Sequence, residues 1–333
     1  KSVLALEGNR EYDNVANKLG VPFVRLNTIL VATSLPEFLA SFVIYLYLKA
    51  KGYPVRWVSG RWLRKGEPSL SRRVKGGIVV ANYGVIDSFS LIYSLYDALK
   101  DSGVDFRLGC RVVDVKEADG VVVETTCGNF VGKYLVNAAG LYADEIAKMS
   151  GLDVEIKPGK GVMAVFAGLK LSNIITPIPL RTHPRTKGGA IIPTLYGTVI
   201  VGPSFAEVEE KEDFSVESES FELLKAKFER LIEGGFSKLI PIKVYAGNRP
   251  LSPTGDFIIE RKGNIVHVLG AESPAFTAAP AIAKRVLKLM GVELNYVRDV
   301  ERPRPYRKGG RVVCPCRGVT EEEVREAVRR GSK

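Results

Sequence analysis

Apolar residues along the first third of the chain follow helical and strand-like spacings in turn. Residues 3–19 carry apolar side chains at helical spacing and stop at Gly20, with Pro22 beyond, which predicts a helix. The run RLNTILVAT (25–33) predicts a strand, and residues 35–51 predict a helix. Beyond them, GGIVVANYGVID and SFSLIYSLYDALKDSG predict a strand with a turn and then an amphipathic helix that ends at Gly103.

Two later segments share the order strand, small-residue turn, helix. In the first, YLVNAAG (134–140) is a continuous apolar run, as in a strand covered on both faces, and it breaks at Gly140 into the helical pattern LYADEIAKMSG. In the second, the apolar strand IVHVLG (265–270) leads through Gly, Ser, Pro and Ala residues into a long helix. This order brings backbone N–H groups to a phosphate or a dinucleotide.

Residues 153–252, between those two units, are mostly strand-like and contain one charged helix. A smaller set of alternating Val-rich runs, separated by the turns ADG and CGN, precedes the first unit and predicts an antiparallel excursion. The whole pattern predicts a mixed α/β fold. In it, a discontinuous Rossmann-like dinucleotide domain carries an inserted antiparallel β-rich substrate domain.

The charge of the chain changes this picture little. Lys and Arg number 48 against 37 Asp and Glu, a formal net charge of +11, and the cations are spread along the chain without a ladder of aromatic residues. That distribution favours a solvated basic surface over nucleic-acid binding. A basic surface also suits a small anionic substrate or an anionic membrane face.

The apolar run Phe38–Leu48 has eleven residues, too few to span a bilayer, and predicts a buried helix. No signal peptide is recognisable at Lys1, so we expect a cytoplasmic protein, with the inner face of the membrane as a further location. Four cysteines in a chain of this length do not indicate a disulfide framework. Cys110 and Cys127 are expected to be small buried apolar residues.

The segment GKGVMA (159–164) has the spacing G-x-G-x-x-[GA], but it leads into a strand rather than a helix, so we reject it as a dinucleotide fingerprint. Three other segments are NAAGLYADEIA (137–147), GNRPLSPTGDFII (247–259) and GAESPAFTAAPAIA (270–283). Together they resemble FAD-dependent oxidoreductases of the D-amino-acid-oxidase type. Within that family, the chain is similar to the branch of the anaerobic glycerol-3-phosphate dehydrogenases and the L-2-hydroxyglutarate oxidases.

The resemblance implies that FAD lies against both small-residue turns. The first turn would pass close to the cofactor, because small residues let the backbone approach a ligand, and the second would lie beside the flavin. A plain helix entry is the alternative for each turn taken alone. The residues that the resemblance assigns to cofactor binding are Val112, whose backbone would meet the adenine, and Asn137, Ala138, Ala139, Gly140, Gly270, Glu272, Ser273, Ala275, Phe276 and Thr277.

Arg249 and His183 are the predicted catalytic residues. The family's arginine at the first position grips the anionic end of the substrate, and a planar guanidinium suits a carboxylate or a phosphate. His183 would accept the proton of the substrate hydroxyl, and an ordinary surface histidine is the equal alternative. His267, inside an apolar strand, is expected to be structural. Further pocket candidates are Lys160, Lys187 and Tyr196.

Two features concern the ends of the sequence. Flavoproteins of this type open with a strand and a G-x-G-x-x-G turn, neither of which precedes the first helix here, so we expect the chain alone to bind FAD poorly. At the other end, Cys314 and Cys316 precede a helix with the capping box Thr320–Glu323. This resembles the start of a bacterioferritin-associated-ferredoxin-like domain, in which such a pair supplies two of the four thiolates of a 2Fe–2S cluster.

The resemblance therefore implies an FAD-dependent dehydrogenase that oxidises a small anionic 2-hydroxy compound, with sn-glycerol 3-phosphate as the leading substrate. Electrons would continue through an iron–sulfur centre to a quinone or a partner subunit. L-2-hydroxyglutarate, an amino acid or an opine is the alternative substrate, and a non-catalytic homologue or subunit is the alternative outside the enzymes. The predicted division is an FAD-domain helix at 1–20, a substrate-domain part at 21–76, FAD-binding parts at 77–152 and 253–295, the substrate domain at 153–252, a linker at 296–310 and an incomplete 2Fe–2S domain at 311–333.

Overall fold

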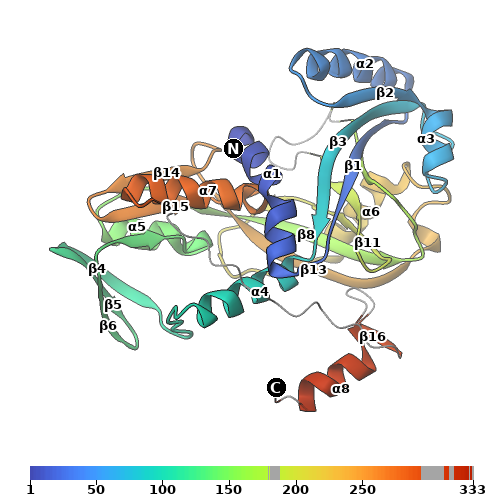
Figure 1. Cartoon of the computed structure of the whole chain (residues 1–333). Coiled ribbons are helices and arrows are strands. Elements are labelled where there is room, and N and C mark those ends of the chain that lie inside the picture. Colours follow the sequence, from blue (N-terminus) through green and yellow to red (C-terminus); the bar gives the residue numbers. More distant parts are fainter. Residues whose placement is uncertain (179, 181–187, 294–310, 315–318, 330, 332–333) are drawn as a thin grey trace.

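A large sheet forms one half of the protein (Figure 1). The computed structural model describes the whole chain except residues 179, 181–187, 294–310, 315–318, 330 and 332–333. Nine strands of the described chain pair in the order β12-β8-β11-β10-β9-β1-β3-β2, with β13 also paired to β8. The strands are β1 Phe23–Ala32, β2 Val55–Ser59, β3 Gly76–Ile86, β8 Lys157–Ala167, β9 Ile174–Pro177, β10 Ala190–Pro193, β11 Val199–Gly202, β12 Ala206–Glu207 and β13 Ile240–Leu251.

The other half of the described chain contains a small sheet and a separate second three-stranded sheet. In the small sheet, β14 (Ile258–Lys262), β15 (Ile265–Leu269) and β7 (Leu135–Asn137) pair in the order β14-β15-β7. β14 and β15 form an antiparallel hairpin, whereas β7 runs parallel to β15. The two predicted strand–turn–helix units are therefore neighbours, and their strands end at the same edge of the sheet. The expected mixed α/β fold is confirmed.

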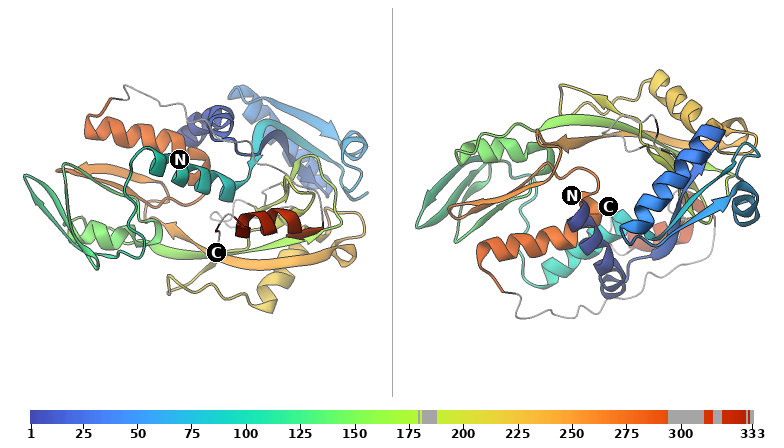
Figure 2. Two further views of the ribbon diagram at one scale, coloured as in Figure 1. Left: turned by 60° about the horizontal axis from the view of Figure 1, so that its bottom comes forward. Right: turned by 90° about the horizontal axis from the view of Figure 1, so that it is seen from above.

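Helices pack against both sheets. α7 (Ala275–Met290) packs on β14 and β15, α5 (Ala143–Met149) packs on β15 and β7, and α1 (Ser2–Leu19) lies beside α7 (Figure 2). The remaining elements are α2 Leu35–Ala50, α3 Gly60–Gly66, α4 Ser88–Asp101, α6 Ser218–Glu229, α8 Glu321–Arg329, the short 3-10 helices η1 Gly140–Tyr142 and η2 Phe236–Lys238, and the strands β4 Val112–Ala118, β5 Gly120–Thr125, β6 Gly128–Gly132, β16 Val312–Cys314 and β17 Val319–Thr320.

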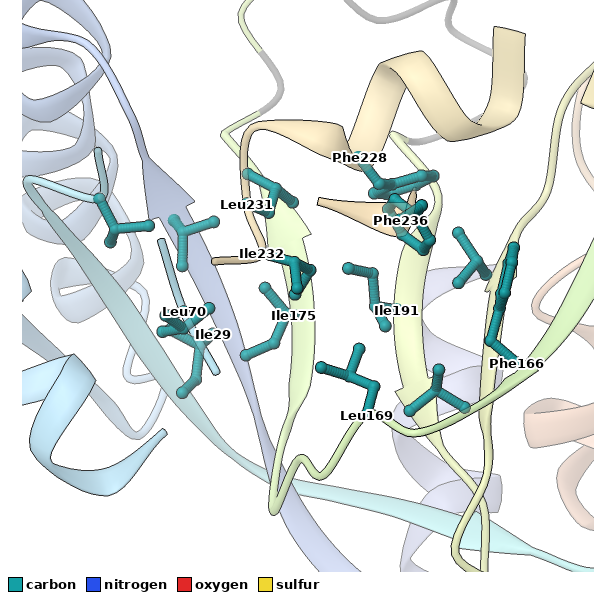
Figure 3. Packing of buried hydrophobic residues seen from close by; sticks show 14 of the residues in the cluster. Ile29, Leu70, Phe166, Leu169, Ile175, Ile191, Phe228, Leu231, Ile232 and Phe236 are labelled. Carbon is teal, nitrogen blue, oxygen red and sulfur yellow. The ribbon is translucent and has the colours of Figure 1, made fainter. Parts of the chain in front are cut away.

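The main apolar core lies between the large sheet and α6 (Figure 3). Phe166 of β8 and Ile191 of β10 point into it, and Phe228 of α6 and Phe236 of η2 cover them. β10 and β11 consist of apolar residues, glycine and proline, and their fully buried side chains Ile191, Val199 and Val201 belong to this core. The predicted boundary at 76/77 falls inside β3, because all of β3 belongs to the large sheet. The division into domains stays a prediction.

The apolar run Phe38–Leu48 is helical, as predicted, but the prediction that this helix is buried is wrong. One face of α2 packs on the sheet, where the Phe38 ring stacks on Trp57 with 4.7 Å between their centroids. Ser41, fully buried, accepts a hydrogen bond of 2.9 Å from Trp57 Nε1. The apolar side chains of the opposite face are exposed.

The expectation for Cys110 and Cys127 is also wrong, because these two cysteines form a disulfide. Cys110 precedes β4, and Cys127 lies in the turn between β5 and β6. The antiparallel register of β4 with β5 sets Val112 opposite Thr125, and this pairing brings the two cysteines to a Cα–Cα distance of 5.5 Å. Neither cysteine lies in a strand interior, and Cys127 is exposed.

One contact between α1 and α7 involves a carbonyl that a proline deprives of its usual helical donor. Pro280 lies inside α7 and has no N–H to donate to the carbonyl of Phe276, four residues earlier. The hydroxyl of Tyr12, from α1, donates to that carbonyl instead. At Gly8 the two helices are so close that a Cβ would lie 2.3 Å from the Thr277 carbonyl oxygen. These contacts hold α7 against α1.

Candidate functional site

The first predicted turn follows β7 and is fixed by a buried amide. Asn137 is 2% exposed, and its Nδ2 donates to the Ala143 carbonyl at 2.7 Å. Its Oδ1 accepts from the backbone N–H of Ala139 at 3.4 Å. The side chain of Asn137 thus holds the turn closed, so we assign it a positioning role beside its predicted contact with the cofactor.

His267 supports the same turn from the neighbouring strand. Its Nδ1 lies 3.1 Å from Asn137 Nδ2, and its Nε2 lies 3.2 Å from Ser150 Oγ. Because Asn137 Nδ2 can only donate, Nδ1 must accept. The Ser150 hydroxyl donates to the Ala147 carbonyl, so Nε2 carries the proton and donates to Ser150. The ring is therefore neutral, and burial lowers the pKa of His267. The expected structural role of this histidine fits these contacts.

Beyond Asn137, the turn leaves room for a ligand. Gly140 has φ of 60°, and a Cβ built there would meet no atom within 4 Å. Ala139 and Val112, two of the predicted cofactor residues, face one cavity of about 390 Å³. The same cavity is lined by Tyr142 and by Glu145, and the Tyr142 hydroxyl donates to Glu212 at 2.6 Å. The structure therefore brings Val112 to the first turn, although 25 positions separate it from Asn137 in the sequence.

The second predicted turn follows β15 at the same edge of the small sheet. Gly270 has φ of 65°, and a Cβ there would lie 2.5 Å from Ser252 Cβ, so the position requires glycine. The Ser252 hydroxyl donates to the Asp256 carbonyl at 2.5 Å. Glu272 follows in the turn, and its carboxylate pairs with Lys1 Nζ at 2.5 Å. The backbone N–H of Ala275 donates to the Glu272 carbonyl at 2.7 Å where α7 begins.

The last predicted residues of this turn differ in their surroundings. Ala275 is buried in the core under α7. Phe276 is exposed on its outer side and stacks on Tyr12 with 6.2 Å between ring centroids. Thr277 is half-buried, with its carbonyl toward Gly8. Ser273 and Ala138 are exposed at their respective turns. The side chains of this group thus do not converge. Both turns contain small residues, but of their two glycines only Gly140, in the first turn, has open space beside it.

Arg249 lies near the carboxyl end of β13, opposite Gly159 of β8. Its Nε donates to the Gly159 carbonyl at 3.4 Å, and its guanidinium lies 5.2 Å from the centre of the Phe205 ring. Burial lowers the pKa of Arg249, and the charge of Glu272 acts in the opposite direction. The predicted substrate residue of the large sheet is therefore electrostatically coupled to the second turn of the small sheet.

Lys160 and Tyr196, the weaker pocket candidates, are engaged in structural contacts. Lys160 is 5% exposed, and its Nζ donates to Asp213 at 2.7 Å and to Ser215 at 3.1 Å. The hydrogen bond from Lys160 is the main reason why the pKa of Asp213 is lowered to about 2. The Tyr196 hydroxyl donates to Asp87, whose carboxylate caps the first turn of α4. The sequence around Lys160 did not indicate that its side chain would pair with Asp213.

Three predicted residues, His183, Lys187 and Cys316, lie outside the described residues. Cys314, at the end of β16, is half-buried. Among the described residues no group of three or more His, Cys, Asp or Glu side chains is arranged to hold a metal ion. The predicted capping box is confirmed, because Thr320 Oγ1 accepts from the Glu323 N–H at 3.3 Å and Glu323 accepts from the Thr320 N–H at 2.8 Å.

The partners of Arg249 were not foreseen from the sequence. Phe205 and Glu272 come from segments 44 residues before and 23 residues after it, and no short-range pattern joins them. Glu272 was assigned to the cofactor turn alone. Only the pairing of β13 with β8 and the position of the second turn bring them together.

Comparison with known proteins gives the following relatives. A family model described as FAD dependent oxidoreductase (DAO) matches residues 1–289. The glycerol 3-phosphate dehydrogenase of Caloramator mitchellensis is 26% identical over 99% of this chain and 74% of that protein. The L-2-hydroxyglutarate dehydrogenase of Escherichia coli K12 is 25% identical over 86% of this chain and 78% of that protein.

Solved structures show the same fold. The FAD-bound L-alpha-glycerophosphate oxidase of Mycoplasma pneumoniae has a TM-score of 0.79 at 24% identity and covers 87% of this chain and 80% of its own. The glycine oxidase of Geobacillus kaustophilus has a TM-score of 0.78 at 20% identity and covers 88% and 80%. No helix among the described residues is both long and apolar enough to cross a membrane.

Proposed function

The chain belongs to the DAO family of FAD-dependent oxidoreductases, and from this membership we propose that it oxidises a small anionic 2-hydroxy compound. The leading candidate is sn-glycerol 3-phosphate, with dihydroxyacetone phosphate as product. The relatives named glycerol 3-phosphate dehydrogenase and L-alpha-glycerophosphate oxidase support this choice. The observation that carries it is Arg249, a partly buried cation whose Nε donates to the Gly159 carbonyl and whose guanidinium lies beside the Phe205 ring.

The two turns fit an FAD molecule. Both follow parallel strands of the small sheet at one edge, and a Cβ at Gly140 would meet open space. The cavity beside Ala139 and Val112 has room for part of a nucleotide. We propose that the residues of these turns, together with Val112, hold the cofactor. When bound, FAD supplies the acceptor for the hydride that leaves the carbinol carbon of the substrate.

The residues of the chain would act on the substrate in three ways. Arg249 would bind the phosphate or carboxylate with its planar guanidinium. Because the strand that carries Arg249 is paired along its length with β8, the bound anion would be held in one orientation. We propose that His183 accepts the hydroxyl proton.

Bleaching of bound flavin tests the proposal. The protein, loaded with FAD under anaerobic conditions, is mixed with sn-glycerol 3-phosphate, and the loss of oxidised-flavin absorbance is followed. Arg249→Ala should raise the substrate concentration for half-maximal rate by about 100-fold, since a charge-assisted contact of about 2–3 kcal/mol is lost. For Arg249→Lys, this concentration should lie between those of the unchanged protein and Arg249→Ala. Arg72→Ala, which removes a surface arginine that is 91% exposed, is the matched control.

Two results would contradict the proposal. If Arg249→Ala and Arg72→Ala gave the same concentration dependence, Arg249 would not bind the substrate anion. If no 2-hydroxy compound bleached the FAD-loaded protein, the proposed reaction would be wrong, and the non-catalytic alternative would gain support.

L-2-hydroxyglutarate is the second candidate substrate, because a relative of similar identity carries the name L-2-hydroxyglutarate dehydrogenase. An amino acid or opine is a weaker candidate, suggested only by the shared fold with glycine oxidase. The same bleaching assay, run with each compound at equal concentration, separates them.

We also propose that the electrons pass to a quinone or a partner subunit in the cytoplasm or at the inner face of the membrane. Cys314 and Cys316 would supply two thiolates to a 2Fe–2S cluster. The described residues do not complete a ligand set, and no step of the proposed reaction depends on the cluster. Iron content and visible absorbance of protein matured with iron and sulfide, compared with Cys314→Ser, test this assignment.

A further inference from the structure

One face of α2 is apolar and exposed along the helix. Leu35, Leu39, Phe42, Val43 and Leu46 follow the spacing i, i+4, i+7, i+8, i+11, which places them in one stripe. All five are exposed, with Leu39 at 62% and Val43 at 66%. The helix holds only two charged residues, a glutamate in its first turn and a lysine in its last, and neither interrupts the stripe. A contiguous apolar surface of this kind marks an interaction site.

The opposite face fastens α2 to the large sheet. Phe38 stacks on Trp57, and Trp57 Nε1 donates to Ser41. Phe42, at the border between the two faces, meets the edge of the same indole with 5.2 Å between the ring centroids. A Cβ at Gly76 would lie 2.2 Å from the Phe38 ring, so helix and strands are in close contact. The exposed stripe is therefore held at a fixed place on the surface, and it cannot turn inward.

The surroundings of this stripe are strongly basic. Residues 35–75 contain nine Lys and Arg residues against two Glu, which accounts for seven of the net eleven positive charges of the chain. Arg61, Trp62, Arg64 and Lys65 of α3, with Ser59, line an open hollow of about 650 Å³. α2 and α3 both pack on β2 and β3, at the same end of the molecule (Figure 1).

These features select one occupant. An exposed apolar stripe at the same end of the molecule as the exposed indole of Trp62 and several cations has the composition of a surface that lies in the interface of an anionic bilayer. A second copy of the chain would fit poorly, because a two-fold contact through this end of the molecule would bring the cations of α3 in one copy toward those in the other. We propose that the α2 stripe inserts into the interface of an anionic lipid bilayer, with Arg61 and Lys65 on the lipid phosphates. This docking does not depend on the substrate.

Helix α4 offers a contrast within the same molecule. It also exposes apolar residues at helical spacing, namely Phe89, Ile92 and Tyr93, with Leu99 further along. Its own charged side chains are two aspartates and one lysine, so it lacks the basic border of α2. α4 therefore provides a matched control, with similar apolar exposure but without the charge that an anionic surface requires.

Vesicle flotation of the full chain tests the proposal. We expect flotation with vesicles of phosphatidylcholine and about one third phosphatidylglycerol, and little flotation with phosphatidylcholine alone or at high salt. Leu39→Glu/Val43→Glu/Leu46→Glu should lower the bound fraction by about tenfold or more, because charged side chains are costly in the interface. Arg61→Glu/Lys65→Glu should lower binding to the anionic vesicles. Ile92→Glu/Tyr93→Glu should bind as the unchanged protein does.

Three outcomes would overturn the proposal. The first is that the α2 variant, Leu39→Glu/Val43→Glu/Leu46→Glu, floats with anionic vesicles to the same extent as the unchanged protein. The second is that the α4 variant, Ile92→Glu/Tyr93→Glu, no longer floats with anionic vesicles. The third is dimerisation in the absence of vesicles. If analytical ultracentrifugation showed a concentration-dependent dimer for every protein except the α2 variant, the stripe would join two copies of the chain. Circular dichroism and the melting temperature of each variant show that the substitutions, all at exposed side chains, leave the fold intact.

Discussion

The large and the small sheet position their residues by different means. Arg249 stands inside a twelve-residue strand, β13, whose sheet rests on a core of apolar side chains. In the small sheet, β7 has three residues and β15 five, and most of the predicted cofactor residues lie beyond the ends of these two strands. There a buried polar set, Asn137, His267 and Ser150, fixes the first turn. Packing fixes the position of Arg249, whereas hydrogen bonds fix the first turn, so the two sites should respond to different perturbations.

The largest effect should come from the core of the large sheet. Phe166 is 1% exposed, and its ring lies 5.1 Å from that of Phe236 and 6.2 Å from that of Phe221. Phe166→Ala should lower the free energy of unfolding by about 3–5 kcal/mol, through lost burial and the cavity left behind. Phe214→Ala, at a phenylalanine that is 57% exposed, should change it by less than about 1 kcal/mol. Urea denaturation measures both, and equal losses would contradict the proposed core.

The small sheet should instead respond to pH through His267. Burial lowers the pKa of the folded His267 below the ordinary value of 6.5. When the pH falls below 6.5, His267 is protonated in the unfolded chain but still neutral in the folded chain. Proton uptake therefore favours the unfolded state, and the free energy of unfolding decreases until the pH reaches the lower pKa of the folded state. We expect the free energy of unfolding to fall by at most about 1.4 kcal/mol per pH unit in this window from this group. Chemical denaturation at several pH values measures the slope.

The control for this pH effect is the other histidine. The sequence has two, so His183→Gln should keep the slope, whereas His267→Gln should lose it together with part of the overall stability. A slope that survives His267→Gln would assign the pH dependence to other groups, and the polar set would then not govern the small sheet in this range.

The smallest effect concerns α7, which covers the small sheet. Tyr12→Phe removes the hydroxyl that bonds to the Phe276 carbonyl and should cost about 1 kcal/mol. In a Pro280→Ala background, the new N–H at residue 280 can reach that carbonyl, so Tyr12→Phe should cost less there. Thermal or urea unfolding of the four proteins gives the coupling. Equal costs in both backgrounds would show that the proline does not create the need for Tyr12.

The strand–turn–helix units could be predicted from the sequence, because continuous apolar runs and small-residue turns are local signals. The two errors both concern relations that local pattern does not contain. The disulfide depends on the register that sets Val112 opposite Thr125. The exposure of α2 depends on which elements cover it, and a helix that is apolar nearly all round gives no amphipathic sign of its outer face.

The candidate site divides in the same way. The glycines at the turns and the arginine in β13 could be found from family motifs, since each lies in a short segment with its own spacing. The coupling of Arg249 to Glu272 and the meeting of Val112 with Ala139 in one cavity depend on pairing between distant strands. Such contacts follow from the assembled sheets, so the sequence suggested the participants but not their partners.

The link between Tyr12 and Pro280 has a consequence for how the sequence can change over generations. A proline at 280 is tolerable only while another group serves the carbonyl of Phe276, and here that group comes from α1. Loss of the hydroxyl first would leave a partly buried acceptor without this donor, whereas loss of the proline first would be nearly neutral. Homologous sequences should therefore show the two positions changing together, with tyrosine at 12 persisting wherever proline stands at 280.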